Sequence, residues 1–157
     1  MRTPTSLKGH PLHPILVALP IGLFVFSLIA DIIYVAGWGA AHWQSVAYFD
    51  LAGGIICALL AAVPGFIDLF AVSEPNLRRI GITHMSIMLL AVAIFAVDFW
   101  MRHSQRFPYT TPFILSIIGI LVLLVGGWLG AKLVHVFGMT VEDRRGARTP
   151  GGPSPAI

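Results

Sequence analysis

The chain has 157 residues, of which 57% are hydrophobic and 11% are charged, and its mean hydropathy is +0.85. A soluble domain usually carries about 25% charged residues, so this composition excludes an ordinary soluble protein and indicates one embedded in lipid. The net charge of +3 reflects basic residues at the ends of apolar stretches, and no nucleic-acid partner is expected.

Four apolar stretches are each long enough to cross about 30 Å of hydrocarbon. They lie at Pro14–Ala36, Trp43–Ala71, Arg79–Met101 and Pro112–Phe137. None of them alternates like a barrel strand, and lipid requires backbone groups to be satisfied within each segment, so four helices follow. Because the connections are short, sequential helices must be antiparallel neighbours. The predicted fold class is an all-α, four-transmembrane-helix antiparallel bundle.

The distribution of Lys and Arg predicts the orientation of this bundle. Eight basic residues fall on one side of it: Arg2, Lys8, Arg78, Arg79, Lys132, Arg144, Arg145 and Arg148. Only Arg102 and Arg106 fall on the other side. We therefore expect both termini in the cytoplasm, with residues 1–141 as an integral membrane domain. Residues 142–157 are expected to be a disordered cytoplasmic tail, because the chain from Gly146 onward is rich in Gly and Pro.

Three of the predicted helices each carry two polar residues on one face, one near each end. In two helices the members are eighteen residues apart, which is five full turns, and in the third they are fourteen apart, about 40° from alignment. The pairs are His13 with Asp31, Asp50 with Asp68, and His84 with Asp98. Ionisable groups at membrane depth usually face the bundle interior, so these faces are expected to point inward.

Antiparallel topology sorts the polar residues into two layers. The cytoplasmic layer gathers His10, His13, Asp68, His84 and His135. The outer layer gathers Asp31, Asp50 and Asp98, which we expect to approach one another. Hydroxyl donors such as Ser27, Tyr34 and Ser45 are candidates to satisfy these aspartates.

Two prolines and a glycine-rich segment mark local features of the bundle. Pro20 and the Pro64-Gly65 pair are expected to kink the first and second helices. The small-residue spacing in Gly126–Gly130 permits close helix approach, which serves packing, dimerisation or a flat cofactor. No clear internal sequence repeat is visible.

The motifs that open the chain and punctuate its helices resemble those of a known family. They are His10-Pro11-Leu12-His13-Pro14-Ile15-Leu16-Val17, Pro20-Ile21-Gly22, Gly65-Phe66-Ile67-Asp68, Arg79 with His84-Met85, and Gly127-Trp128-Leu129-Gly130 before Leu133-Val134. Over about residues 9–141 the chain resembles the bacterial membrane proteins grouped as domain of unknown function 2231. That resemblance implies a four-helix, multi-pass domain in the bacterial inner (cytoplasmic) membrane and no established activity. A histidine that often precedes the last glycine in that family is replaced here by Phe137, with His135 nearby.

The leading functional hypothesis is a haem b site in a small electron-transfer subunit. Haem iron takes axial histidines, and a bundle can offer two of them from facing helices. His13 and His84 are the preferred pair, because each lies just inside the membrane on a polar face, and His10 and His135 are substitutes or supporting partners.

Two other hypotheses remain open. One is a transition-metal site without haem, for which His10, His13, Asp68, His84 and His135 are the candidate nitrogen and oxygen ligands; such a site can also belong to a proton or cation path. The other is an accessory subunit without a cofactor, which packs as a homodimer or in a larger membrane complex. Signatures of hydrolases, kinases and nucleotide binding are missing from the sequence, which argues against those enzyme classes.

Overall fold

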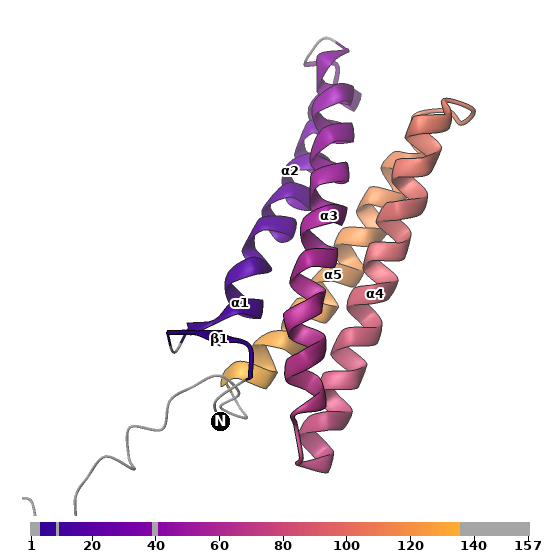
Figure 1. The fold of residues 1–157 in the computed structure, drawn as a ribbon. Helices are drawn as coiled ribbons and strands as arrows, with labels where there is room; N and C mark the ends of the chain where they lie inside the picture. The colour runs from indigo at the N-terminus through magenta and orange to yellow at the C-terminus, as the bar shows by residue number, and fades with distance from the viewer. Residues whose placement is uncertain (1–3, 9, 39–40, 136–157) are drawn as a thin grey trace, which may run out of the picture.

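A computed structural model of the protein describes residues 4–8, 10–38 and 41–135. Its elements, in chain order, are β1 (Ser6–Leu7), β2 (His10–Pro11), α1 (Leu12–Leu16), α2 (Ala18–Val35), α3 (His42–Phe70), α4 (Pro75–Ser104) and α5 (Thr110–His135). The four spans Leu12–Val35, His42–Phe70, Pro75–Ser104 and Thr110–Val134 are long and apolar enough to cross a membrane. The predicted fold class is confirmed (Figure 1).

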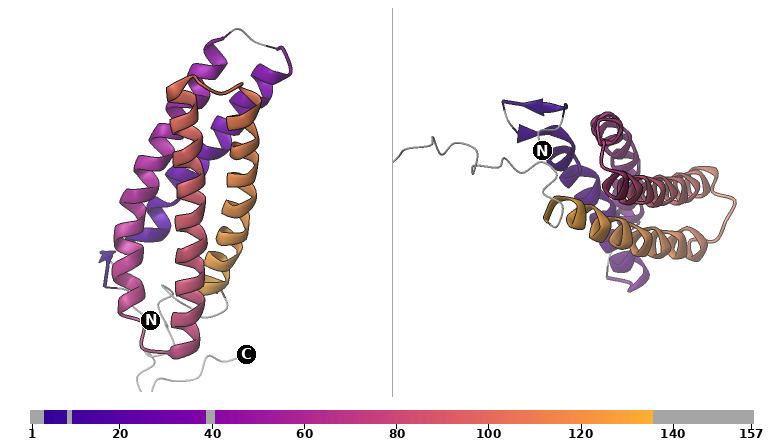
Figure 2. Two further views of the ribbon diagram at one scale, coloured as in Figure 1. Left: turned by 90° about the vertical axis from the view of Figure 1, so that its right-hand side faces the viewer. Right: turned by 90° about the horizontal axis from the view of Figure 1, so that it is seen from below.

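The helices form two antiparallel pairs. α1 and α2 pack against α3 as the first hairpin, α4 packs against α5 as the second, and contacts between the hairpins are sparser than those within each. Figures 1 and 2 show the N-terminal strands, the α3–α4 connection and the end of α5 at one end of the bundle, which we call the terminal end. The end of α2, the start of α3 and the α4–α5 connection lie at the far end.

The first helix breaks at Val17, between α1 and α2. Pro20 explains this position, because it has no N–H to donate to the carbonyl of Leu16 and its ring crowds that carbonyl. The expected disturbance therefore falls one turn before the proline. Pro64, in contrast, lies inside a continuous α3.

The third span is longer than the predicted Arg79–Met101. It begins at Pro75, where the side chain of Glu74 accepts hydrogen bonds from the backbone N–H groups of Asn76 and Leu77. It ends at Ser104, followed by Gln105 in the left-handed conformation. Arg102 is consequently helical and does not belong to a loop, because its charge finds partners inside the bundle.

The N-terminal strands are attached to the terminal end of α3. Ser6 and Leu7 pair antiparallel with Pro11 and His10, respectively. The backbone N–H of Thr5 donates to Asp68 Oδ1 at 3.0 Å, which fixes the strand pair against the bundle.

The centre of the bundle holds two stacked phenylalanines, one from each hairpin. The rings of Phe24 and Phe95 lie with centroids 3.9 Å apart and planes 12° apart, and both side chains are buried. Each ring lies over a glycine of its own hairpin. A Cβ at Gly54 would stand 2.6 Å from the ring of Phe24, and one at Gly119 would stand 2.5 Å from Phe95. The absence of these side chains allows the rings to meet on the central axis.

The two hairpins repeat this packing pattern at matched positions. The spacing is 71 residues between α1–α2 and α4, and 65 residues between α3 and α5. The matched pairs are His13 with His84, Phe24 with Phe95, Gly54 with Gly119, Ala61 with Gly126, and Gly65 with Gly130. Because both hairpins run in the same direction, their equivalent contacts imply an approximate two-fold axis along the bundle. The expectation of no internal repeat is therefore corrected: the repeat lies in a few contact positions within otherwise divergent apolar sequence.

Candidate functional site

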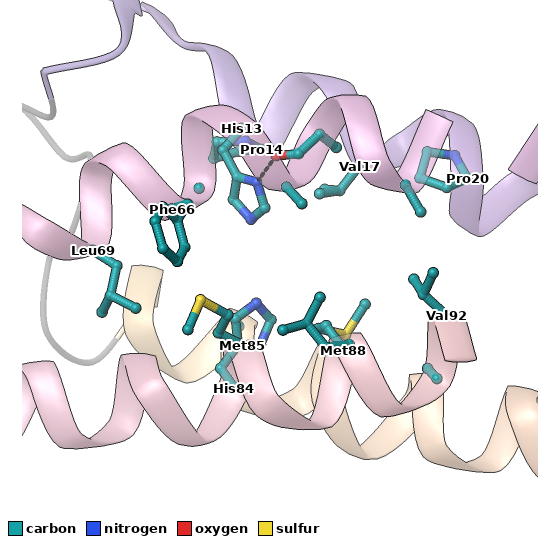
Figure 3. Close-up of a pocket in the computed structure, with 18 of the residues that line it drawn as sticks. His13, Pro14, Val17, Pro20, Phe66, Leu69, His84, Met85, Met88 and Val92 are labelled. Atoms are coloured by element: carbon teal, nitrogen blue, oxygen red, sulfur yellow. Dashed lines mark hydrogen bonds between the residues drawn. The ribbon is translucent and has the colours of Figure 1, made fainter. Parts of the chain in front are cut away.

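Two histidines face a cavity between the hairpins in the terminal half of the bundle. His13 of α1 and His84 of α4 lie on opposite walls of this cavity, whose volume is about 670 Å³ (Figure 3). Their ring centroids are 6.4 Å apart and their ring planes are 80° apart. The remaining lining is almost wholly apolar and comes from all four spans.

Each imidazole is held by a backbone carbonyl of its own hairpin. His13 Nδ1 lies 2.8 Å from the carbonyl oxygen of Ala61, and His84 Nδ1 lies 2.8 Å from that of Gly126. A carbonyl only accepts hydrogen bonds, so Nδ1 must be the donor in each ring. In a neutral imidazole the lone pair is then on Nε2. Metal-ligating histidines are typically fixed in this way, by a hydrogen bond from the nitrogen that does not bind the metal.

Each imidazole also lies over a glycine, four residues after the carbonyl that it contacts. A Cβ at Gly65 would stand 2.7 Å from His13 Nδ1, and one at Gly130 would stand 2.9 Å from His84 Cε1. The glycines therefore let the rings approach the backbones of α3 and α5. The same local arrangement supports both histidines.

The other members of the predicted cytoplasmic layer do not join this pair. His10 is exposed on β2, where its Nδ1 lies 3.2 Å from the carbonyl oxygen of Lys8. Asp68 lines the cavity, but its Oδ1 accepts the N–H of Thr5. The side chain of His135 lies outside the described residues.

A metal site with three or more protein ligands finds no support in the described residues. Within 4–8, 10–38 and 41–135, no group of three or more His, Cys, Asp or Glu side chains is placed to hold a metal ion. His10 points away because the strand pair directs it outward, and Asp68 instead holds Thr5. The residues that meet are thus two imidazoles from opposite sides.

The far end of the bundle contains a second polar site, centred on Arg102. Its Nη2 lies 2.7 Å from Asp31 Oδ2 and its Nε lies 2.7 Å from Asp98 Oδ1. Ser116 donates to Asp98 Oδ2 at 2.7 Å, and the hydroxyl of Tyr109 donates to Asp31 Oδ1 at 2.5 Å. We call these five residues the Arg102 network.

The Arg102 network corrects two expectations for the outer layer. Asp31 and Asp98 do converge, but Asp50 is not part of the network, and its Oδ2 is buried without a hydrogen-bond partner in the described part of the chain. The donors are Arg102, Tyr109 and Ser116, whereas Ser27 donates to the carbonyl of Ala47. The four-residue spacing from Asp98 to Arg102 is the sequence signal that could have identified this arginine.

The two polar sites therefore differ in chemical capacity. In the Arg102 network each carboxylate is paired with the guanidinium and with hydroxyl donors, so it is suited to hold helices together. At His13 and His84 the Nε2 atoms have no hydrogen bond among the described residues. Two such nitrogens beside an apolar cavity can bind a metal centre.

A family model described as "Predicted membrane protein (DUF2231)" matches residues 9–143. No curated protein and no solved structure matches the chain.

Proposed function

The chain belongs to the DUF2231 family of predicted membrane proteins, and from the site between its hairpins we propose that it binds haem b and transfers electrons. His13 and His84 are the proposed axial ligands. The observation that carries this proposal is the placement of two imidazoles on opposite walls of one apolar cavity, each with Nδ1 hydrogen-bonded to a carbonyl.

The distance between the rings fits ligation from both sides of one metal. A metal–imidazole bond is about 2.0 Å long and the nitrogen lies about 1.1 Å from the ring centroid, so opposed ligands have centroids about 6.2 Å apart. The observed separation is 6.4 Å. A direct N–H···N hydrogen bond between the rings would bring their centroids to about 5.1 Å, so the observed spacing does not fit such a bond; the two rings meet edge to face.

The cavity fits a large planar cofactor better than a bare ion. Its volume of about 670 Å³ lies in the range of pockets for cofactor-sized ligands. Phe66, Met85 and Met88 are among the apolar side chains beside the histidines (Figure 3). Such a lining excludes water and would contact the faces of a macrocycle. It offers an ion only the two imidazoles and the carboxylate of Asp68, which already accepts a hydrogen bond from Thr5.

The protein residues have three tasks in this proposal. His13 and His84 supply neutral nitrogen ligands, the carbonyls of Ala61 and Gly126 fix their orientation, and the apolar lining keeps water away. Haem supplies a one-electron couple whose potential depends on its axial ligands and surroundings. No residue at the site is required to exchange a proton for this function.

An optical spectrum of the purified protein tests the proposal. Protein expressed with sufficient haem and purified in mild detergent is expected to show a Soret band and, after dithionite reduction, sharp α and β bands, with about one haem per chain. His13→Ala and His84→Ala should each lose most of the bound haem while the helices remain inserted. His103→Ala is the matched control, because His103 lies at the far end beside Tyr48.

Two results would contradict haem binding at this site. One is wild-type protein without a Soret band after expression with excess haem. The other is full haem content in both His13→Ala and His84→Ala. Colourless protein with stoichiometric metal would favour the metal-ion alternative, and protein with neither would favour the accessory-subunit alternative.

A further inference from the structure

The duplicated packing around the site extends to every group that positions its two histidines. In the first hairpin His13 donates to the carbonyl of Ala61 and lies over Gly65. In the second hairpin His84 donates to the carbonyl of Gly126 and lies over Gly130. All three positions have the spacing of the repeat. The axis that relates the hairpins therefore passes between the two imidazoles.

We propose that Gly65 and Gly130 are a matched pair of positioning residues. They leave room for each imidazole against its own hairpin, where the bond to the carbonyl keeps the ring oriented toward the metal, so that a small external ligand cannot enter. This inference rests on the proposed haem site. It assigns the protein to electron transfer without ligand exchange and excludes gas binding or oxygen chemistry at the metal.

Geometry restrains each ring from swinging out of the cavity. A ring that rotates away gives up a 2.8 Å hydrogen bond to a carbonyl in a largely apolar setting. The ring nitrogen would be left without its partner, in addition to the lost metal bond. The same restraint acts on both rings, because His13 and His84 each make an equivalent bond to a carbonyl of their own hairpin. Neither histidine is therefore expected to dissociate from the metal more readily than the other.

The glycines set how far each ring lies from the axis. A methyl group at Gly65 or Gly130 would overlap the imidazole at 2.7 Å and 2.9 Å, respectively, which is too close for a Cβ contact. The ring would have to shift away from its helix and break the bond to the carbonyl four residues earlier. We therefore expect Gly65→Ala and Gly130→Ala to weaken one axial bond each without removing the ligand.

Carbon monoxide binding to the dithionite-reduced protein measures whether an axial position opens. Wild type is expected to show no carbon monoxide difference spectrum. Gly65→Ala and Gly130→Ala should each bind carbon monoxide, and to a similar extent, because the two positions are equivalent. Gly22→Ala is the control, since a Cβ at Gly22 meets nothing within 4 Å. It should behave like wild type.

A second measurement uses the protein without haem and detects positioning directly. Histidine ¹⁵N chemical shifts of the apoprotein should report Nδ1-protonated rings for His13 and His84 in wild type. In Gly65→Ala only the His13 signal should move, and in Gly130→Ala only the His84 signal. Helix content measured by circular dichroism should be unchanged in both variants.

The outcomes separate this inference from the haem proposal. A wild-type protein with a Soret band that binds carbon monoxide readily would overturn the closed site and leave haem binding intact. Glycine variants that load haem, stay closed to carbon monoxide and leave both histidine signals in place would overturn the positioning role. Wild type without any Soret band would overturn both proposals.

Discussion

The relative orientation of the two imidazoles is the most specific property of the site. Their planes are 80° apart, close to perpendicular. Each ring is fixed by its own hairpin, through the carbonyl of Ala61 or of Gly126. Because the supports lie on different helices, the angle belongs to the fold and is not free to adjust.

If the protein binds haem as proposed, this angle predicts the electron paramagnetic resonance spectrum of its oxidised form. Perpendicular axial imidazoles leave two iron d orbitals nearly equal in energy, which gives a low-spin signal dominated by one large g value. Parallel rings would give three well-separated g values. We expect the first type at low temperature. A well-resolved three-line spectrum from wild type would show that the rings reorient when haem binds.

The sequence predicts the two histidines that face the cavity, but it does not predict where His10 lies. His13 and His84 were paired from sequence because both lie near the same membrane face on inward-facing stripes. His10 has the same chemistry three residues earlier, but β2 carries it to the surface. A two-residue strand held by Thr5 and Asp68 leaves no periodic signal, so its effect on His10 was not readable.

Among the elements, the Arg102 network joins the two hairpins at the far end. Asp31 belongs to the first hairpin and Arg102 to the second, and they occupy matched positions of the repeat, 71 residues apart. Opposite charges at these equivalent positions favour the pairing of the first hairpin with the second. Two copies of the first hairpin would instead place two Asp31 carboxylates against each other. A buried ion pair often has this role in fixing which partners associate.

Arg102→Met is expected to destabilise the protein by about 3–5 kcal/mol, because it leaves the carboxylates of Asp31 and Asp98 buried without their cation. Reversible unfolding in mixed micelles, followed by circular dichroism, measures this change. Arg106→Met is the control, because Arg106 is exposed in the connection between α4 and α5. Its free energy of unfolding should lie within about 0.5 kcal/mol of that of wild type. Equal stability of the two variants would mean that the network does not hold the hairpins together.

Tyr109 adds a pH dependence to the same network. Burial, followed by the hydrogen bond to Asp31, raises the pKa of the Tyr109 phenol above its ordinary value. A raised pKa in the folded state favours folding while the phenol is protonated, so its contribution is complete below about pH 10 and is lost as pH rises further. Tyr109→Phe should therefore remove part of the alkaline loss of stability. The difference in tyrosinate absorbance between wild type and Tyr109→Phe reports the ionisation of Tyr109. Its midpoint should lie at a pH well above that of free tyrosine. A midpoint near pH 10 would contradict this prediction.

Helix spans were predictable from sequence, whereas their ends were less so. An apolar run of membrane length has few alternatives to a helix. The predicted third span ends at Met101, just before Arg102, because an isolated charge belongs in water. Asp98 lies one turn earlier on the same helix, but Asp31 comes from α2, which the sequence does not place beside α4. The ion pair with Asp31 therefore allows Arg102 to lie inside the bundle, where an unpaired charge would be unfavourable. The break at Val17 has a local cause in Pro20, so the sequence did indicate it.

At the scale of the whole molecule, two similar hairpins enclose one cavity on their shared axis. The repeat escaped detection in the sequence because most lipid-facing positions accept any apolar residue, so only contact positions remain alike. Those positions are the histidines, the stacked phenylalanines and the glycines beneath them. Most of the matched positions are identical where two backbones or rings meet closely, which is why the repeat is visible in the contacts of the structure and not in a linear comparison.

The orientation of this bundle in the membrane remains a prediction. Figures 1 and 2 place the N-terminal strands and the end of α5 at the same end, so residues 4 and 135 must face one side. Arg102 is buried in an ion network, which leaves Arg106 as the one Lys or Arg exposed at the far end within the described residues. The basic asymmetry is thus stronger than the count of eight against two suggested.

We expect both termini, and with them the end of the bundle nearer to the His13–His84 site, on the cytoplasmic side. Reporter fusions before Arg2 and after Gly146 should both be active as cytoplasmic enzymes and inactive as exported ones. A fusion in the α4–α5 connection, after Arg106, should show the opposite pattern. The reverse result would place the proposed haem near the outer surface, and its electron partner would then have to be sought outside the cytoplasm.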